Sequence, residues 1–224
     1  MTTVFRASTA AHPVPVLTDR SSTVEDVDRR LTERGEQRRA QLMGYATARF
    51  AANGFHPTSV AEITEGLGVG KGVFYWYFDS KEALLRAILA DAQLDLRRRQ
   101  RDAIAVATTP IERIQLGIRT SIEWSVTHAD YFRLVQFAAT DDRFSSGLRR
   151  GERIAVTDAA QHLRAAMDAG EIAKADPELL AHAILGVHTH LVQLVHRGLL
   201  EPEAEVIDAA VDFCLHGLTG HPPV

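Results

Sequence analysis

The chain has 224 residues, of which 46% are hydrophobic and 24% charged, and its formal net charge is −4. This length suits one large domain or two small ones, and the composition is that of an ordinary soluble globular protein. No apolar run approaches the roughly 20 residues of a membrane-spanning helix, no signal peptide is recognisable, and Cys214 alone cannot form an intrachain disulfide. We therefore expect a cytoplasmic protein without a membrane partner.

The negative charge is unevenly distributed along the chain. Residues 1–90 carry a net charge of +1, whereas residues 91–224 carry −5. Because an acidic surface repels DNA phosphates, a nucleic-acid contact is favoured in the first part of the chain.

Residues 1–31 lack a sustained apolar period and contain Pro13 and Pro15, which predicts a mobile N-terminal arm. Five arginines stand at and just beyond its end: Arg29, Arg30, Arg34, Arg38 and Arg39. They are either a solvated helix face or contacts that carry the arm to phosphates or into a minor groove. The sequence alone leaves both alternatives open.

Beyond about residue 32, proline and glycine divide the chain into amphipathic helical segments, and no segment alternates long enough to predict a strand. Asp176-Pro177 and Glu201-Pro202 are expected helix starts, and Gly170 and Gly198 expected stops. The sequence therefore predicts an all-α fold. The expected helices, about nine in number, lie near 32–53, 58–66, 70–78, 80–107, 110–127, 129–138, 143–169, 176–198 and 202–217.

Residues 54–85 read GFHPTSVAEITEGLGVGKGVFYWYFDSKEALL. Thr58 or Ser59 can cap a helix because a hydroxyl accepts a backbone N–H, and Glu62, three residues after Ser59, fits a capping box. Gly68 suits a sharp turn because glycine adopts positive φ without steric cost. This pattern predicts a helix-turn-helix near residues 58–78.

The second helix of this pair has only about eight residues, so packing must hold it. Phe74 and Phe78 lie four residues apart and should face inward with Val69. An aromatic run is then left on the outer faces, which is unfavourable unless something covers it. A DNA groove can do so, since tyrosine hydroxyls and an indole N–H reach phosphates and apolar groups touch thymine methyls.

Glycine at position 72 permits close approach to a duplex, and Lys71 and Lys81 flank the short helix as expected phosphate contacts. The predicted DNA-binding residues are Thr58, Ser59, Gly70, Lys71, Gly72, Val73, Tyr75, Trp76, Tyr77 and Lys81.

The run GLGVGKGVFYWYFDSKEALL resembles the DNA-binding signature of TetR-family regulators, which reads roughly Val-Ser-Lys-Gly-Thr-Leu-Tyr-x-Tyr-Phe followed by x-Ser-Lys-Glu-x-Leu. The resemblance covers residues 38–90. Three positions depart from it: Gly70 replaces a Ser or Thr and loses a hydroxyl cap, Val73 replaces a common Thr or Ser, and Trp76 stands where His or Tyr is frequent. These departures bear on which operator is bound more than on DNA binding itself.

The resemblance implies an N-terminal three-helix DNA-binding domain with a helix-turn-helix, expected at 32–84, and a C-terminal helical ligand-binding and dimerisation domain, expected at 85–224. It also implies a homodimer on a palindromic double-stranded DNA operator and a small hydrophobic effector, such as a drug, a lipid-like metabolite or an acyl-CoA. No cofactor and no metal are implied.

Two apolar-faced helices near 176–198 and 202–217 could form a four-helix interface with a second copy, or they could pack within one chain. The residues predicted for a dimer interface are Leu180, Ile184, Val187, Leu191, Val206, Ala210 and Val211.

Trp124, His128 and Phe132 are the hypothesis for an effector pocket, with core packing as the alternative. Four histidines crowd the segment 182–196 at spacings of six, two and six, which scatters them around a helix and argues against a metal site. The run Arg97, Arg98, Arg99 and Arg101 indicates a solvated, ion-paired face.

Three function classes remain to be weighed. A repressor released by its effector is the leading hypothesis, and an activator with the same docking is an alternative. A helical binding module that has lost DNA contact is another. An enzyme is disfavoured, because the sequence holds no nucleophile elbow, HExxH, CxxC or phosphate-cradling glycine loop.

Overall fold

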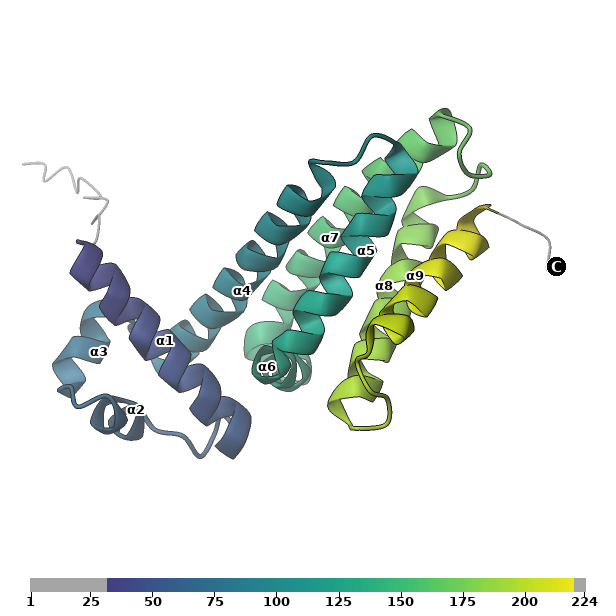
Figure 1. Cartoon of the computed structure of the whole chain (residues 1–224). Helices are drawn as coiled ribbons and strands as arrows, with labels where there is room; N and C mark the ends of the chain where they lie inside the picture. The colour runs from purple at the N-terminus through teal and green to yellow at the C-terminus, as the bar shows by residue number, and fades with distance from the viewer. Residues whose placement is uncertain (1–31, 220–224) are drawn as a thin grey trace, which may run out of the picture.

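The computed structural model describes residues 32–219 and contains, within that range, nine α-helices and no strand (Figure 1). The predicted all-α class is therefore confirmed, while the arm expected at 1–31 lies outside the described residues. The helices are α1 (Glu33–Asn53), α2 (Val60–Gly66), α3 (Lys71–Tyr77), α4 (Lys81–Ile104), α5 (Pro110–Thr127), α6 (Ala129–Ala139), α7 (Asp142–Asp168), α8 (Pro177–His196) and α9 (Ala204–Thr219).

Local signals set most helix boundaries. Pro177 is the first residue of α8, and the carboxylate of Asp176 caps the helix by accepting the backbone N–H of Glu178 at 2.9 Å. Gly170 and Gly198 follow α7 and α8 with φ of +73° and +67°, a backbone region open to glycine. The expected ranges differ from the observed helices by up to three residues: α4 ends at Ile104 instead of near 107, and α2 and α9 each begin two residues later than expected.

The described residues form two apolar cores. The first joins α1–α4 to α6 and the start of α7, through residues such as Phe50, Phe74, Leu85 and Leu134. The second lies among α5, α7, α8 and α9. In Figure 1, α1–α3 lie at one end of the molecule and α4 runs from them toward the bundle, so α4 connects the two cores physically.

Among the described helices, α8 alone is long and apolar enough by composition to cross a membrane. This corrects the expectation that no segment reaches such a length. In this structure α8 packs against α5, α7 and α9, with Ala181, Ile184 and Val192 buried.

Candidate DNA interface

The turn between α2 and α3 has the geometry that the sequence predicts. Ser59 caps α2, its Oγ accepting the Glu62 backbone N–H at 3.1 Å. Gly68 has φ of +64°, and the Val69 N–H donates to the Thr64 carbonyl at 2.9 Å across the turn. These bonds fix the angle at which α3 leaves α2.

Only half of the expected capping box forms. The Glu62 carboxylate turns away from the N-cap and accepts the Nε–H of Arg49 on α1 at 2.8 Å, because a guanidinium is a stronger partner than a neutral backbone N–H. This bond lowers the pKa of Glu62. The carboxylate therefore ties α1 to α2.

Helix α3 presents two contrasting faces. Phe74 and Phe78 are buried, at 0% and 5% exposure, which confirms their predicted inward orientation. Tyr75 and Trp76 are 55% and 61% exposed. The buried pair anchors the helix, and the exposed pair forms most of its outward apolar surface.

The start of α3 is open. Gly70 is the N-cap and provides no side-chain hydrogen bond, as its substitution for Ser or Thr predicts. A Cβ built on Gly70 or Gly72 would meet no atom within 4 Å, and Lys71 is exposed. The surface of a large partner molecule could therefore approach the α3 backbone closely at this end.

Four of the predicted DNA contacts are placed differently from expectation. Thr58 is fully buried, and its hydroxyl donates to the Gly54 carbonyl at 2.8 Å, so it serves the loop before α2. Tyr77 is only half-exposed and packs against the first core, because it follows Phe74 by three residues, about one helical turn. Val73 is likewise half-buried.

Lys81 is the fourth of these residues. Its Nζ donates to the carbonyls of Phe55 at 2.7 Å, His56 at 3.1 Å and Thr58 at 2.8 Å. An ammonium has three N–H donors, so all three are used within the protein. Lys81 is therefore not placed as a phosphate contact in this structure.

The aromatic residues suggested for an effector pocket separate into two groups. Trp124 is buried, stacks on His128 with ring centroids 4.1 Å apart, and donates its indole N–H to Asp95 at 2.8 Å. That bond is the main cause of the lowered pKa of Asp95. Phe132 lies elsewhere, against His196 at 5.0 Å.

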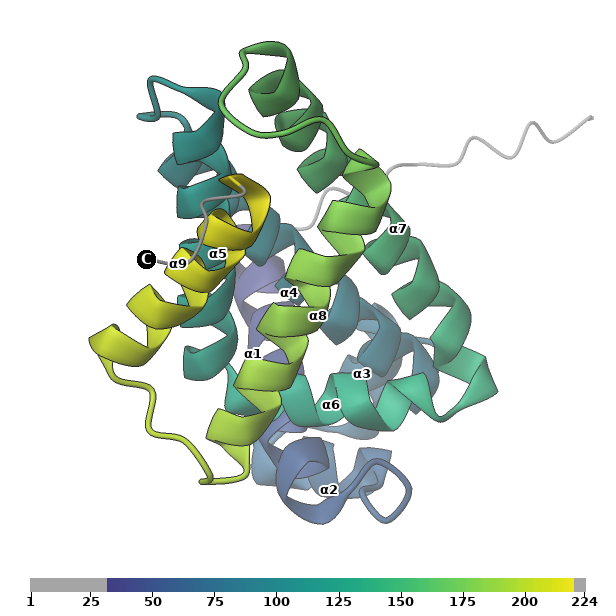
Figure 2. The ribbon, with the colours of Figure 1, turned by 90° about the vertical axis from the view of Figure 1, so that its right-hand side faces the viewer.

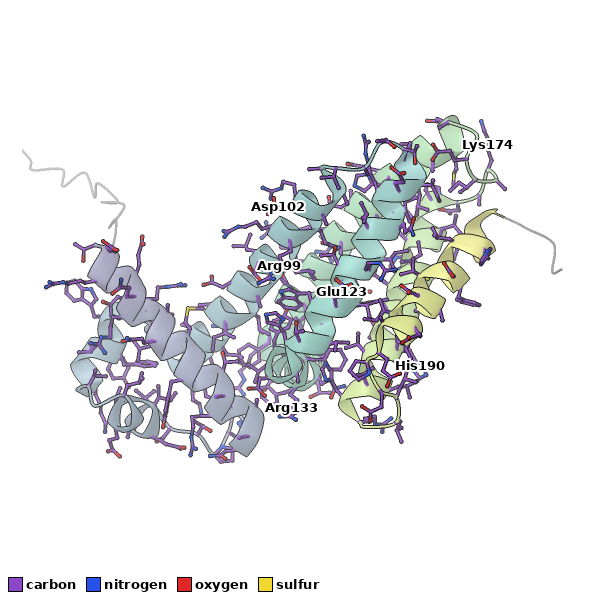
Figure 3. The ribbon with its side chains drawn as sticks, viewed as in Figure 1. Arg99, Asp102, Glu123, Arg133, Lys174 and His190 are labelled. Atoms are coloured by element: carbon purple, nitrogen blue, oxygen red, sulfur yellow. The ribbon has the colours of Figure 1, made fainter. Side chains whose placement is uncertain are left out.

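Two shallow surface hollows lie between α7 and α8, away from this aromatic stack. The larger, of about 400 Å³, is lined by Glu152, His182, Leu185, Gly186, Thr189, His190 and Gln193. Figure 3 labels His190 on α8. The aromatic residues proposed for the effector pocket line neither hollow. Their role in effector binding remains a prediction.

The residues predicted for a dimer interface face the interior of the chain. Ile184, Ala210 and Val211 are buried in the second core, and Leu180, Val187 and Leu191 pack against it; Val206 is half-buried. Their spacing correctly marks an apolar face, but helices of the same chain cover it. The opposite face of α8 and α9 is exposed instead and carries Leu179 and Phe213, each 67% exposed.

The charged and histidine clusters behave as solvated or structural groups. Within the described range, no three His, Cys, Asp or Glu side chains lie together as a metal site. In the arginine run, Arg99 pairs with Asp95 at 2.9 Å, and Figure 3 shows Arg99 on the part of α4 that extends away from α2 and α3.

Sequence reasoning overlooked a junction between the helix-turn-helix and the bundle. The Phe55 ring, from the loop before α2, lies 5.4 Å from Phe144 on α7, and the Arg143 guanidinium lies 5.6 Å from its centroid. Arg143 also bonds Glu82 on α4 at 3.0 Å and Asp141 at 2.7 Å, and lowers the pKa of Asp141 to about 2. No local signal marks these contacts, which join distant segments.

Comparison with known proteins agrees with this geometry. Residues 43–88 match the family model of bacterial regulatory proteins, tetR family. The HTH-type transcriptional repressor KstR2 of Mycobacterium tuberculosis is 35% identical over 86 residues, which are 38% of this chain and 43% of that protein. The HTH-type transcriptional activator FasR of Mycolicibacterium smegmatis is 28% identical over 100 residues, 45% of this chain and 46% of that protein. The matched part spans less than half the length of these curated relatives.

The fold resembles solved structures over most of the chain. A TetR/AcrR-family transcriptional regulator from Thermobifida fusca has a TM-score of 0.64 at 25% identity, covering 81% of this chain and 98% of that one. The ketosteroid transcriptional regulator KstR2 of Mycobacterium tuberculosis has a TM-score of 0.63 at 24% identity, covering 81% and 95%.

Proposed function

We propose that this chain, which belongs to the TetR family of bacterial regulatory proteins, is a ligand-responsive transcriptional repressor that binds a palindromic operator as a homodimer through α2 and α3. The observation that carries the proposal is the exposure of Tyr75 and Trp76 on α3, opposite the buried Phe74. Contiguous exposed apolar surface of this kind marks an interaction site on a protein.

The chemistry of α3 favours a particular mode of base recognition. Its sequence KGVFYWY contains no Arg, Asn, Gln, Asp or Glu, the residues that form the common bidentate contacts with base edges. Lys71 can reach a phosphate or a guanine, and the aromatic side chains can contact thymine methyl groups or phosphates. We therefore expect the operator to present thymine at the positions facing Tyr75 and Trp76.

The exposed face of α8 and α9 supports a homodimer. In Figure 2 these two helices lie in front of the others, and Leu179 and Phe213 each leave two thirds of their surface exposed. Ala183 and Gly186 lie on the same exposed face of α8 and permit close approach of a second copy. A two-fold pairing through this face would present two copies of α3 to successive major grooves about 34 Å apart.

Release by an effector requires a ligand that binds the two conformations with different affinities. The same DNA docking also serves activation, and the name of the relative FasR records an activator, so activation is the second candidate. A binding module without DNA contact is disfavoured by the exposed Lys71 and Tyr75.

Hydroxyl-radical footprinting on DNA from upstream of the gene tests the proposal. We expect two protected half-sites centred about 34 Å apart on one face of the duplex, lost in a Tyr75→Ala variant. A single protected site would contradict the dimer, and uniform weak protection would contradict operator recognition.

A further inference from the structure

Lys81 is the first residue of α4, and its side chain reaches back over the loop that precedes α2. Its Nζ bonds the carbonyls of Phe55, His56 and Thr58 at 2.7, 3.1 and 2.8 Å. It also lies 4.5 Å from the centroid of the Phe55 ring, within the range of a cation–π contact. One cation thus holds both the backbone of this loop and its aromatic side chain.

The loop held by Lys81 leads directly into the helix-turn-helix. Thr58, one of the three acceptors, is followed by Ser59, the N-cap of α2. The Thr58 hydroxyl bonds the Gly54 carbonyl at 2.8 Å, which closes the loop on itself. A displacement of the first turn of α4 would therefore pull on the start of α2.

The environment of the ammonium opposes a role as a phosphate contact. Burial lowers the pKa of Lys81, Glu82 raises it, and Arg143 lowers it further. Three carbonyl acceptors saturate the three N–H donors, so a phosphate could be bound only by breaking bonds already made. Lys71 differs, because it is exposed at the start of α3.

We propose that Lys81 is a positioning residue for DNA recognition: it holds the loop before α2 to the first turn of α4 and thereby sets the helix-turn-helix, without touching DNA. The inference rests on the proposed DNA-binding function. It separates two lysines that flank the same short helix, of which Lys71 would contact the duplex and Lys81 would not.

Salt dependence of DNA binding distinguishes the two roles. Each phosphate contact contributes about one unit to the slope of log K against log salt concentration. Fluorescence anisotropy should give Lys71→Met a slope smaller by about one, with similar losses on operator and scrambled DNA. Lys81→Met should keep the wild-type slope, yet lose about tenfold or more in operator affinity and in the operator-to-scrambled ratio. A slope reduced by one in Lys81→Met, or an unchanged operator affinity, would overturn the inference.

A conservative variant covers the case in which Lys81→Met does not fold. Lys81→Arg keeps the positive charge, but a planar guanidinium cannot replace an ammonium among three converging carbonyls. We expect it to lose operator affinity at an unchanged slope, whereas wild-type affinity would indicate a retained phosphate contact and contradict the inference.

Hydrogen exchange on the free protein keeps this test separate from the proposed function. The backbone amides of Glu62 and Ile63, in the first turn of α2, should exchange faster in Lys81→Met and remain unchanged in Lys71→Met. If wild-type protein binds no DNA, the proposed function fails. Equal exchange in the two variants would independently refute the positioning role of Lys81.

Discussion

The ring of Phe55 lies 5.2 Å from the ring of Phe137, and the two planes are inclined by only 29°. Phe55 belongs to the loop before α2 and Phe137 to α6, so this stacked pair joins the candidate DNA interface to the helices of the bundle. We infer that a ligand-induced shift of α6 would reach the helix-turn-helix through this pair.

Phe55→Ala should lower the free energy of unfolding by about 3–5 kcal/mol, because it empties a site surrounded by aromatic rings. Tyr75→Ala, at an exposed aromatic of α3, is the matched control and should change it by no more than about 0.5 kcal/mol. Urea unfolding followed by circular dichroism measures both, and a loss in Phe55→Ala as small as that in Tyr75→Ala would contradict a stabilising role for this ring.

Gly72→Ala should separate stability from DNA binding. An added Cβ meets no atom within 4 Å, and alanine favours a helix over glycine by up to about 1 kcal/mol, so thermal stability should be unchanged or slightly raised. DNA affinity should fall about tenfold or more, because the methyl group stands where the duplex would approach. A stable variant with full affinity would place the DNA on another face.

Phe213→Asp should dissociate the proposed dimer without unfolding the chain, because this side chain is 67% exposed and lies outside both cores. Val106→Asp, at a 77% exposed residue after α4, is the control and should remain dimeric. Sedimentation velocity gives the masses. A dimeric Phe213→Asp protein would exclude this face of α9 as the interface.

His188 should make stability depend on pH. Its Nε2 lies 2.9 Å from the Ser125 Oγ and 3.2 Å from the Ser121 carbonyl, and burial lowers the pKa of the imidazole. The unfolded chain, with a histidine pKa near 6.5, therefore binds the proton more readily than the fold does. The stabilisation is complete above about pH 6.5 and declines as the pH falls below it.

Urea unfolding at about pH 7.5 and pH 5.5 should accordingly show lower stability in acid, and His188→Gln should reduce this difference. Part of the pH difference in stability should remain in His188→Gln because of His162, whose pKa is also lowered by burial. His190→Gln, at an exposed position of the same helix, should leave the difference intact. A pH dependence identical in wild type and His188→Gln would refute the assignment.

The helix-turn-helix could be predicted from the sequence because its determinants are local. Ser59 caps the residue three positions later, Gly68 supplies one positive φ, and Phe74 and Phe78 face inward because they lie one helical turn apart. Each signal operates within a few residues. The Ser59 cap is present even though the Glu62 carboxylate bonds Arg49 instead of the N-cap backbone.

The roles of Lys81 and of the apolar faces of α8 and α9 depend on distant contacts. The carbonyls that bind Lys81 belong to residues 23 to 26 positions earlier, and no local pattern distinguishes such a lysine from a solvated one. Similarly, the spacing of Ile184 and Leu191 indicates a buried face, but not whether this chain or a second copy buries it. In this structure, helices of the same chain bury that face.

The most direct test is a competition titration of wild-type and Tyr75→Ala protein on upstream DNA and on a scrambled duplex of the same length. Both duplexes are measured at the same salt concentration. We expect wild-type protein to prefer upstream DNA by about a thousandfold or more, and Tyr75→Ala to lose most of this preference while remaining folded. Equal affinity of wild-type protein for both duplexes, or a Tyr75→Ala variant that binds as wild type does, would contradict recognition of an operator by α3.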